Sequence, residues 1–473
     1  MSIPIFGVNI PVPQIKIPNE LLEKYADLYK GIRDRKDTVT WRTLIINIRI
    51  LLGQDEPDFN KIQKKYKVKA KKLVKQLVAK TFLDKLIPEI EYAVGVIDAP
   101  NKNVSKDLDF LLLNAKHTCD PMVWNLADYI KGRGKTVAVV NPVGHYNDGQ
   151  TRIIGPIKFF RNIKKVIIIS STQTELGGSV SVLSNVIRLI RNPEFAKKIK
   201  EVDIIIPMFG GSRGHRLGQG PEVGFEIMEA GFNARLLAIS TKDILNKLNE
   251  THIKLPSIKF FSVDIHNLEE PDKTFTEEGF EFKSIDSANG LSVGIFNILR
   301  QKKLLKIPIK LIACDKGAVP RTEKLAENIL MIDGVINLQI VYMEKKRATA
   351  GVIKHTEIVR VEEWKLNGKD ILKRQLSLPK KPNFKHVVLV YSDDMIDTGG
   401  TAEKDLNFIS NFYPNTTLKI FAATHPVFSK GFAALKRIGA DYYCLGNTLY
   451  WEGLEDMSNV EIIDMAPSIY KSI

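Results

Sequence analysis

The chain has 473 residues, which at about 150 residues per domain suggests two or three domains and excludes a single small binding module. Hydrophobic residues make up 44% and charged residues 26%, a composition typical of a globular protein and not of a disordered one. The formal net charge of +15 favours anionic partners, which include nucleic acid, nucleotide phosphates and acidic membranes.

The cysteine content indicates a reducing compartment. Cys119, Cys314 and Cys444 are few, widely spaced and odd in number, which argues against a disulfide framework and against a cysteine-based zinc site. The N-terminus, MSIPIFGVNI, has no basic segment followed by a long apolar one, and no apolar run reaches the ~18 residues of a membrane span. We therefore expect a cytoplasmic protein with no membrane partner.

The region up to residue 134 is predicted to be a helical, Lys-rich extension. Between Lys61 and Lys80 there are nine lysines and no acidic residue. Apolar side chains recur there at near-helical spacing, which predicts an amphipathic helix with a solvated basic face. A docking surface for nucleic acid or an acidic partner is the alternative. Only the charge supports it, so we do not expect nucleic-acid binding.

From residue 135 onward, short β-branched runs alternate with longer helical patterns. Near-continuous apolar strands separated by helices predict an α/β fold with parallel sheets covered by helices on both faces. The nine predicted strands lie at 136–140, 166–170, 202–207, 260–264, 309–314, 338–342, 386–391, 418–424 and 441–445. Ligands bind at the carboxyl ends of such strands, so the residues that follow these runs are the first candidates for a site.

One glycine-containing segment partly matches a nucleotide-binding motif. The sequence GRGKT, from Gly132 to Thr136, resembles the end of a phosphate-binding P-loop. Position 129 is tyrosine where the first glycine of that motif would be, and the predicted strand follows the segment, whereas in a P-loop it precedes it. The segment is predicted to be a turn that ends a helix.

The strongest signal is the segment HVVLVYSDDMIDTGGTAEKDLNFI. A buried strand ends in Asp393 and Asp394, whose carboxylates can accept hydrogen bonds from sugar hydroxyls. A short loop then precedes a helical pattern. Glycines at this position let backbone N–H groups surround a phosphate, the helix N-terminus attracts it, and threonine hydroxyls add donors. The predicted phosphate loop consists of Asp397, Thr398, Gly399, Gly400 and Thr401.

This segment resembles the phosphoribosyl-pyrophosphate loop of type I phosphoribosyltransferases and ribose-phosphate pyrophosphokinases. Further segments resemble the pyrophosphokinases in the same order along the chain, which simple phosphoribosyltransferases lack. They are FFSVDIHN, LIACDKGAVPRTEKLAE, YMEKKRATAG, FAATHPVFSKGFAALKRI and CLGNTLY. The resemblance covers about residues 135–473.

The resemblance implies two tandem phosphoribosyltransferase-type domains with parallel sheets behind the helical extension. The expected boundaries are 1–134 for the extension, 135–300 for the domain on the ATP side and 301–473 for the domain on the ribose phosphate side. It also implies a homo-oligomer, because ATP sites of this family often include residues from a neighbouring subunit.

The resemblance further assigns the metal and the catalytic groups. His266 and Asp315 match positions that handle the Mg²⁺-bound triphosphate, although a lone histidine after a strand is by itself more often structural. Lys345 and Arg347 match the Lys-x-Arg pair of a mobile catalytic loop, which residues 361–385 are expected to enlarge. The ordinary alternative for the pair is a basic surface turn.

On the ATP side the match is partial. Tyr146, Asp148 and Gln150 resemble the adenine-binding Phe-x-Asp-x-Glu pattern, although glutamine in place of glutamate removes a charge. Arg213 matches a phosphate-binding arginine in a segment that otherwise departs from the family. His266 is expected to contact ATP as well.

The implied reaction is Mg²⁺-dependent transfer of pyrophosphate from ATP to the anomeric hydroxyl of ribose 5-phosphate, with release of AMP. Two alternatives stay open. The acceptor could be ADP-ribose, giving ADP-ribose pyrophosphate in NAD salvage, or the chain could be a catalytically silent regulatory homologue.

Overall fold

The structure is a computed structural model, and it divides the chain into two compact units, Met1–Gly95 and Val96–Ile473. It describes residues 2–5, 8–11, 106–115, 119–145, 151–153, 160–172, 180–211, 229–332, 338–349, 352–368, 370–377 and 386–473. In the first unit the described residues are two antiparallel strands, β1 (Ser2–Ile5) and β2 (Val8–Pro11). The basic helix predicted for residues 61–80 lies outside the described residues.

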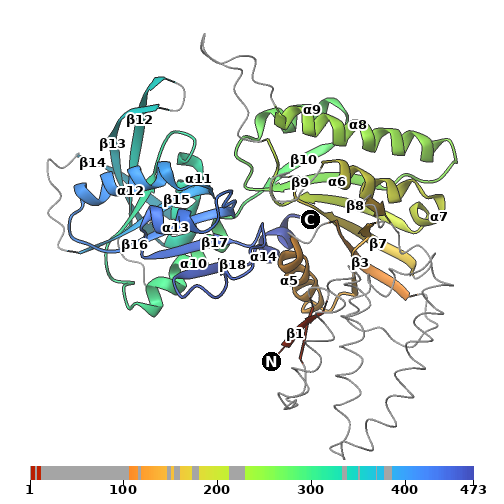
Figure 1. Cartoon of the computed structure of the whole chain (residues 1–473), viewed down its shortest axis with the longest axis horizontal. Helices are drawn as coiled ribbons and strands as arrows, with labels where there is room; N and C mark the ends of the chain where they lie inside the picture. The colour runs from red at the N-terminus through yellow and green to blue at the C-terminus, as the bar shows by residue number, and fades with distance from the viewer. Residues whose placement is uncertain are drawn as a thin grey trace, which may run out of the picture. The chain divides into compact units, whose positions relative to one another are not determined.

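The second unit contains two large sheets, each with helices packed against it (Figure 1). The first has six strands, all parallel, in the order β10-β9-β8-β7-β3-β4. Its strands are β3 (Lys106–Asn114), β4 (Val137–Val140), β7 (Phe160–Ile169), β8 (Ile199–Ile206), β9 (Ser257–Val263) and β10 (Glu281–Ile285). Its helices are α5 (Asp120–Lys131), α6 (Val180–Ile187), α7 (Pro193–Ala196), α8 (Glu229–Asn249) and α9 (Glu269–Glu277), with the 3₁₀ helix η3 (Arg188–Arg191).

The first sheet extends beyond the domain boundary expected at residue 135. Strand β3 lies between β4 and β7, and α5 follows it, so residues 106–131 belong with this sheet and not with a separate extension. Only the second half of β3 is a continuous apolar run, Phe110–Leu113, and that short run gave too weak a signal. The GRGKT segment is a turn after α5, as predicted, with Gly134 at φ 71°.

The second sheet has eight strands in the order β14-β13-β12-β11-β15-β16-β17-β18. The strands from β12 to β18 pair in parallel apart from the edge, where β13 is antiparallel to both β12 and β14. Its strands are β11 (Ile309–Ala313), β12 (Leu338–Thr349), β13 (Val352–Asn367), β14 (Asp370–Leu376), β15 (Val387–Ile396), β16 (Thr416–Pro426), β17 (Tyr442–Gly446) and β18 (Val460–Ile463). Its helices are α10 (Ala288–Gln301), α11 (Val319–Leu330), α12 (Gly400–Phe412) and α13 (Ala433–Ile438). All nine predicted strands are present in the two sheets, which confirms the α/β class.

Part of the long loop expected at 361–385 is instead a β-hairpin. Strands β13 and β14 pair from Val361↔Leu376 to Asn367↔Asp370, and Gly368 has φ 64° in the turn between them. The dipeptide Asn367-Gly368 is a strong hairpin signal that the sequence analysis overlooked. A second, short hairpin joins β5 (Val143–His145) to β6 (Thr151–Ile153).

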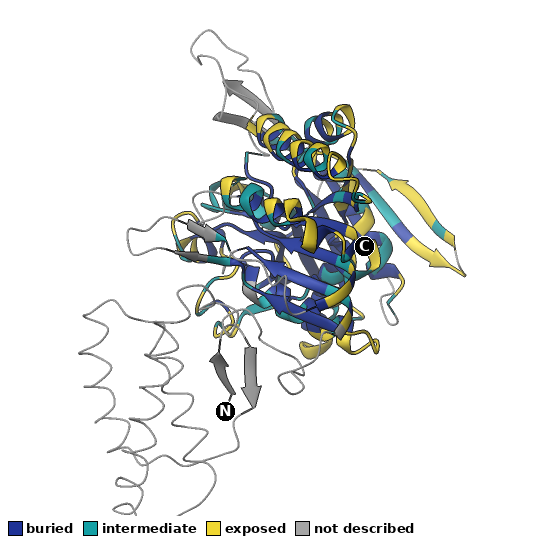
Figure 2. Ribbon diagram, turned by 90° about the vertical axis from the view of Figure 1, so that its right-hand side faces the viewer, coloured by how far each residue is buried: buried dark blue, intermediate teal, exposed yellow. Residues whose placement is uncertain are grey.

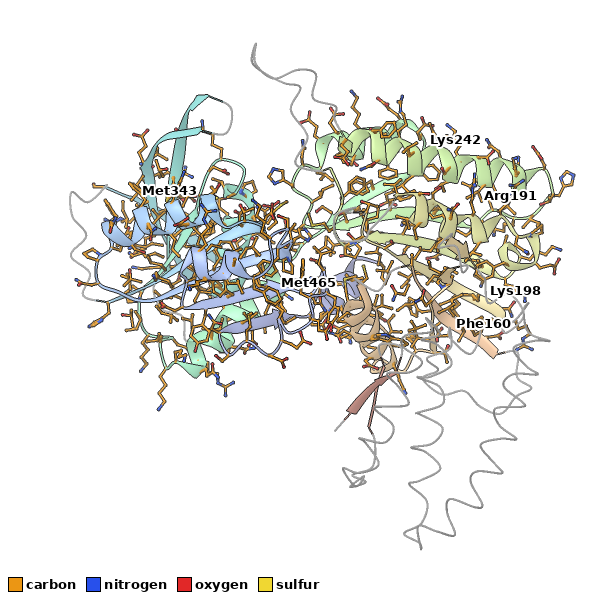
Figure 3. All side chains as sticks on the ribbon, viewed as in Figure 1. Phe160, Arg191, Lys198, Lys242, Met343 and Met465 are labelled. Carbon is orange, nitrogen blue, oxygen red and sulfur yellow. The ribbon has the colours of Figure 1, made fainter. Side chains whose placement is uncertain are left out.

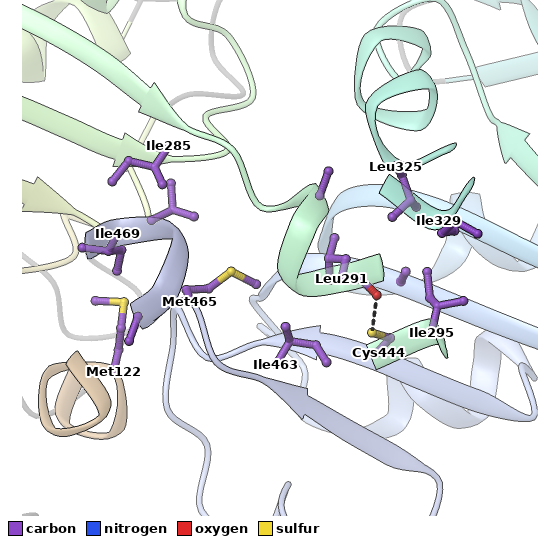
Figure 4. Packing of buried hydrophobic residues seen from close by; sticks show 14 of the residues in the cluster. Met122, Ile285, Leu291, Ile295, Leu325, Ile329, Cys444, Ile463, Met465 and Ile469 are labelled. Carbon is purple, nitrogen blue, oxygen red and sulfur yellow. Dashed lines mark hydrogen bonds between the residues drawn. The ribbon is translucent and has the colours of Figure 1, made fainter. Parts of the chain in front are cut away.

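Two helices connect the sheets by packing. Helix α10 lies against β16, β17 and β18, and Gly294 approaches them so closely that a Cβ atom there would lie 2.1 Å from Ile463 and 2.5 Å from the sulfur of Cys444. The last helix, α14 (Ala466–Ser472), packs against α5 of the first sheet. Figure 4 shows this junction, with Met465 between Met122 and Leu291. One hydrophobic core therefore extends from the first sheet to the second.

Side-chain burial follows the layers. Figure 2 shows the inner strands of the sheets buried and the outer helix faces exposed, and the edge strand β14 is largely exposed as well. Figure 3 shows the side chains on the ribbon, among them Phe160 in β7 and Met343 in β12. The three cysteines are buried and form no disulfide. Among the described residues, no helix is both long and apolar enough to span a bilayer.

Candidate functional site

The predicted phosphate loop has the local geometry of an anion site. Strand β15 ends at Ile396, and α12 begins at Gly400 after Gly399, which caps it with φ 75°. A Cβ atom at Gly399 would lie 2.9 Å from the carbonyl oxygen of Ala434, so a glycine is required both by conformation and by space. Asp397 accepts a hydrogen bond from the backbone N–H of Ser429 at 3.1 Å, which fixes the loop to the segment after β16.

An arginine lies beside this helix N-terminus. The guanidinium of Arg437 would be 3.1 Å from a Cβ atom at Gly400, and its Nε donates to Glu403 in the first turn of α12 at 2.7 Å. The positive charge of Arg437 near the first turn of α12 would attract a phosphate group, although Glu403 partly neutralises that charge.

The two sheets contribute to one site through a histidine and an aspartate. His266, which follows β9, places its Nδ1 2.7 Å from Oδ2 of Asp394, which ends β15. The His266 side chain is 35% exposed, whereas that of Asp394 is 4% exposed. The structure therefore brings together a predicted ATP-side residue and a predicted ribose-side residue.

The adjacent acids Asp393 and Asp394 are electrostatically unequal. Burial and the neighbouring Asp394 charge raise the pKa of Asp393 well above its usual range. Burial also pushes the pKa of Asp394 upward, but the hydrogen bond with His266 and the charge of Arg321 outweigh burial and hold that pKa below its usual range. Asp394 is thus the member of the pair that stays ionised.

A third acid, Asp264, connects four segments of the chain by hydrogen bonds. Its carboxylate accepts hydrogen bonds from Arg321 Nε at 3.0 Å, Ser287 Oγ at 3.0 Å and Thr424 Oγ1 at 2.6 Å. Its backbone oxygen lies 3.4 Å from Nε2 of His425. Asp264 also has φ 42°, a left-handed conformation that few residues other than glycine adopt. The network fixes the loop that carries His266.

Asp315 follows β11, as expected, and it caps the next turn of the chain. Its Oδ1 accepts the backbone N–H of Ala318 at 3.1 Å, which turns the chain into α11. Within the described part of the chain, no group of three His, Cys, Asp or Glu side chains is arranged to hold a metal ion.

Several predicted residues lie outside what the structure describes. They are Tyr146, Asp148, Gln150 and Arg213 on the predicted ATP side. Lys345 and Arg347 lie in strand β12, paired with Thr356 and Ile353 of β13, and their side chains are also outside the described part.

The base of the β12–β13 arm is joined to α11 by a polar cluster. The hydroxyl of Tyr342 lies 2.9 Å from carboxylate oxygens of both Glu323 and Glu362, and the guanidinium of Arg360 lies 3.8 Å from the centre of the tyrosine ring. Trp364 donates to Glu362 at 3.1 Å. These contacts connect the strand that carries Lys345 to the helix that carries Arg321.

Asp264, Arg321 and Thr424 are members of the site that were not predicted from the sequence. All three lie inside segments that carried the family resemblance: Asp264 directly after β9, Thr424 near the end of β16 and Arg321 in the first turn of α11. Polar residues at the carboxyl ends of buried strands were the available signal for Asp264 and Thr424.

The second sheet resembles a known protein family. Residues 292–427 match the family model "Phosphoribosyl transferase domain", and the match includes the loop from Asp397 to Thr401. The matched segment begins within α10 and ends after β16, and it contains Arg321 together with both acids of β15. The predicted resemblance to a phosphoribosyltransferase-type domain is confirmed for this segment.

Solved structures and curated proteins complete the comparison. The phosphoribosylpyrophosphate synthetase of Mycobacterium smegmatis is 18% identical, with a TM-score of 0.49, over 77% of this chain and 97% of that chain. A solute-binding protein of an ABC transporter from Burkholderia multivorans is 11% identical, with a TM-score of 0.28, over 78% of this chain and 90% of that chain. No curated protein matches the chain.

Proposed function

We propose that the protein transfers a pyrophosphoryl group from ATP to the anomeric hydroxyl of a ribose 5-phosphate group, as the ribose-phosphate pyrophosphokinases do. The observation that carries the proposal is the contact between His266 and Asp394 at 2.7 Å. It joins the phosphoribosyl transferase domain to a second α/β sheet at the carboxyl ends of both. A transfer between two substrates needs two such binding surfaces facing one position.

The acceptor binds on the phosphoribosyl transferase domain. Its 5-phosphate is held by the loop from Asp397 to Thr401, where Gly399 and the N-terminus of α12 present backbone N–H groups. Its ring hydroxyls are proposed to donate to Asp393 and Asp394, which lie near the end of β15, a few residues before that loop.

The donor ATP requires Mg²⁺, which would be held by His266 and Asp315. Mg²⁺ usually takes one or two protein ligands and completes its coordination with phosphate oxygens and water, so a site with few protein ligands fits this ion. When bound, Mg²⁺ neutralises the triphosphate and the charge that develops at the β-phosphorus. Tyr146, Asp148, Gln150 and Arg213 are proposed for the adenosine and phosphate groups of ATP.

The chain's own side chains orient the reaction. Asp393 and Asp394 hold the sugar so that its anomeric oxygen is in line with the β-phosphorus, and AMP leaves from the opposite side. Lys345 and Arg347, on the β12–β13 arm, are proposed to stabilise the spread negative charge of the transferred group. Closure of the arm would exclude water from a reactive donor.

The acceptor is tested by incubating the full chain with Mg-ATP and either ribose 5-phosphate or ADP-ribose, followed by mass spectrometry of the products. AMP together with a pyrophosphorylated sugar supports the proposal, and the productive acceptor identifies the substrate. ADP would instead indicate a simple kinase. A regulatory homologue predicts no product with either acceptor and no effect of Lys345→Ala. Light scattering with and without Mg-ATP tests the expected homo-oligomer.

A further inference from the structure

We propose that Arg321 is an acceptor-binding residue, whose two terminal nitrogens donate hydrogen bonds to sugar oxygens beside Asp393 and Asp394. The proposal rests on the proposed function, because it adds a residue to the acceptor side of that site. The proposal requires three things. The guanidinium of Arg321 must be held in place, some of its N–H groups must have no protein acceptor, and these N–H groups must lie next to Asp393 and Asp394.

The guanidinium is fixed along one edge. Its Nε lies 3.0 Å from both carboxylate oxygens of Asp264, and the Arg321 side chain is only 13% exposed. Asp264 is itself held by Ser287 and Thr424. A buried ion pair with a fully coordinated carboxylate allows the arginine little rotation.

Four of the five N–H groups of the arginine remain available. These four belong to the terminal nitrogens, and none of them makes a hydrogen bond to another of the described residues. A nearly buried guanidinium with unused donors is costly to maintain unless a ligand or water accepts them.

The loop after β9 places these donors beside the acids. Asp264 holds Arg321, and His266, two residues later, holds Asp394. Two residues span at most about 7 Å, so both contacts belong to one small region.

The sheet register gives the same placement. Strands β11 and β15 are parallel neighbours, and Ala313 at the end of β11 pairs with Ser392, the residue before Asp393. Arg321 lies in the first turns of the helix that follows β11. It therefore reaches the carboxyl end of the sheet on the side where Asp393 emerges.

The balance of charge favours a sugar over a free phosphate at this position. Burial lowers the pKa of Arg321, but the charges of the neighbouring acids, Asp264 and Asp394 foremost, outweigh burial and raise that pKa. The ionised carboxylates of Asp264 and Asp394 repel an anion. A sugar hydroxyl is both donor and acceptor: the carboxylates take its hydrogen, and arginine N–H groups bind its lone pairs. The same cation beside the attacking oxygen would favour its deprotonation.

The test separates ligand binding from folding with the double variant Asp264→Asn/Arg321→Gln, which removes the two charges together and leaves a neutral pair. Ribose 5-phosphate binding to the full chain is measured by titration calorimetry, and thermal unfolding reports folding. We expect the double variant to stay folded and to bind ribose 5-phosphate at least about tenfold more weakly than the wild type. The matched control is Asp107→Asn/Arg161→Gln, which removes an Nε–carboxylate contact of the same 3.0 Å length on the first sheet.

Arg321→Lys is the second variant and covers the case in which the double variant unfolds. Lysine keeps a charge beside Asp264 but lacks the forked donors, so a loss of about tenfold or more is again expected. Wild-type affinity in either folded variant overturns the proposal, as does a wild-type chain that binds no ribose 5-phosphate. A wild type that binds the sugar phosphate but forms no product with ATP would instead refute the proposed transfer and leave this assignment standing on its binding data.

Discussion

Nδ1 of His266 and Oδ2 of Asp394 lie 2.7 Å apart although the two residues are 128 positions apart in the chain. The contact joins the loop after β9 to the end of β15, and with them the two halves of the proposed site. Removing this contact should change both the rate of the proposed reaction and the NMR signals of His266, which do not depend on activity.

Asp394→Ala is expected to lower the rate of AMP formation from Mg-ATP and ribose 5-phosphate by about a hundredfold or more, because both sugar orientation and His266 lose their partner. The ring-nitrogen NMR signals of His266, assigned with His266→Gln, should shift in the same variant. Asp441→Ala is the control, since the Asp441 carboxylate accepts the backbone N–H of Lys419 at the other end of the sheet. Wild-type rates with unchanged histidine signals would remove Asp394 from the site.

Gly399→Ala tests the phosphate loop, and Gly439→Ala is its matched control. Both glycines have positive φ, 75° and 67°, but a Cβ atom at Gly439 meets nothing within 4 Å, whereas at Gly399 it meets Ala434 at 2.9 Å. Gly399→Ala should therefore lower the free energy of unfolding in urea by roughly 1–3 kcal/mol more than the control does, and weaken ribose 5-phosphate binding. Equal losses of stability would mean that the close contact relaxes freely.

Lys310 predicts a pH dependence of stability far from the site. It is fully buried in β11, and burial, partly opposed by the charge of Glu363, lowers its pKa to about 7. The unfolded chain, with an ordinary lysine pKa near 10.5, binds the proton over a wider pH range. The free energy of unfolding should therefore rise between about pH 7 and pH 10 and lose this contribution below pH 7.

The double variant Lys310→Met/Gln339→Leu replaces the buried lysine and the Gln339 amide that it contacts with apolar groups. It should flatten this part of the pH profile and gain roughly 2–4 kcal/mol of stability at pH 6, where the folded wild type pays the full cost of a buried charge. Denaturant unfolding at several pH values measures both effects. An unchanged slope between pH 7 and pH 10 would show that Lys310 is charged in the folded protein.

Tyr342→Phe should destabilise the base of the β12–β13 arm by roughly 1–3 kcal/mol, because Glu323 and Glu362 then face each other without the hydroxyl between them. Adding Glu323→Gln should recover part of the loss by removing one of the two like charges. Tyr442→Phe is the control, since the hydroxyl of Tyr442 makes no hydrogen bond to another described residue. Thermal unfolding distinguishes the variants, and a Tyr342→Phe variant as stable as this control would contradict the prediction.

Local patterns in the sequence were enough for the elements and for the phosphate loop. The near-continuous apolar runs predicted nine strands because strands of a parallel sheet are buried on both faces. The loop from Asp397 to Thr401 could be recognised because glycines and hydroxyl side chains between a strand and a helix are typical of a phosphate-binding loop. The β13–β14 hairpin was missed although Asn367-Gly368 marked it, and β3 was missed because only half of it is apolar.

The sequence alone thus determined the fold class, the acids at the end of β15 and the loop that follows them, since each depends on residues close together in the chain. Only the tertiary structure revealed that Asp264 binds Arg321 and Thr424, which lie 57 and 160 positions away. Hydrogen bonds between distant segments depend on how sheets and helices pack, and no local pattern encodes that packing. The physical centre of the proposed site, an arginine held between the acids of two sheets, exists only in the folded chain.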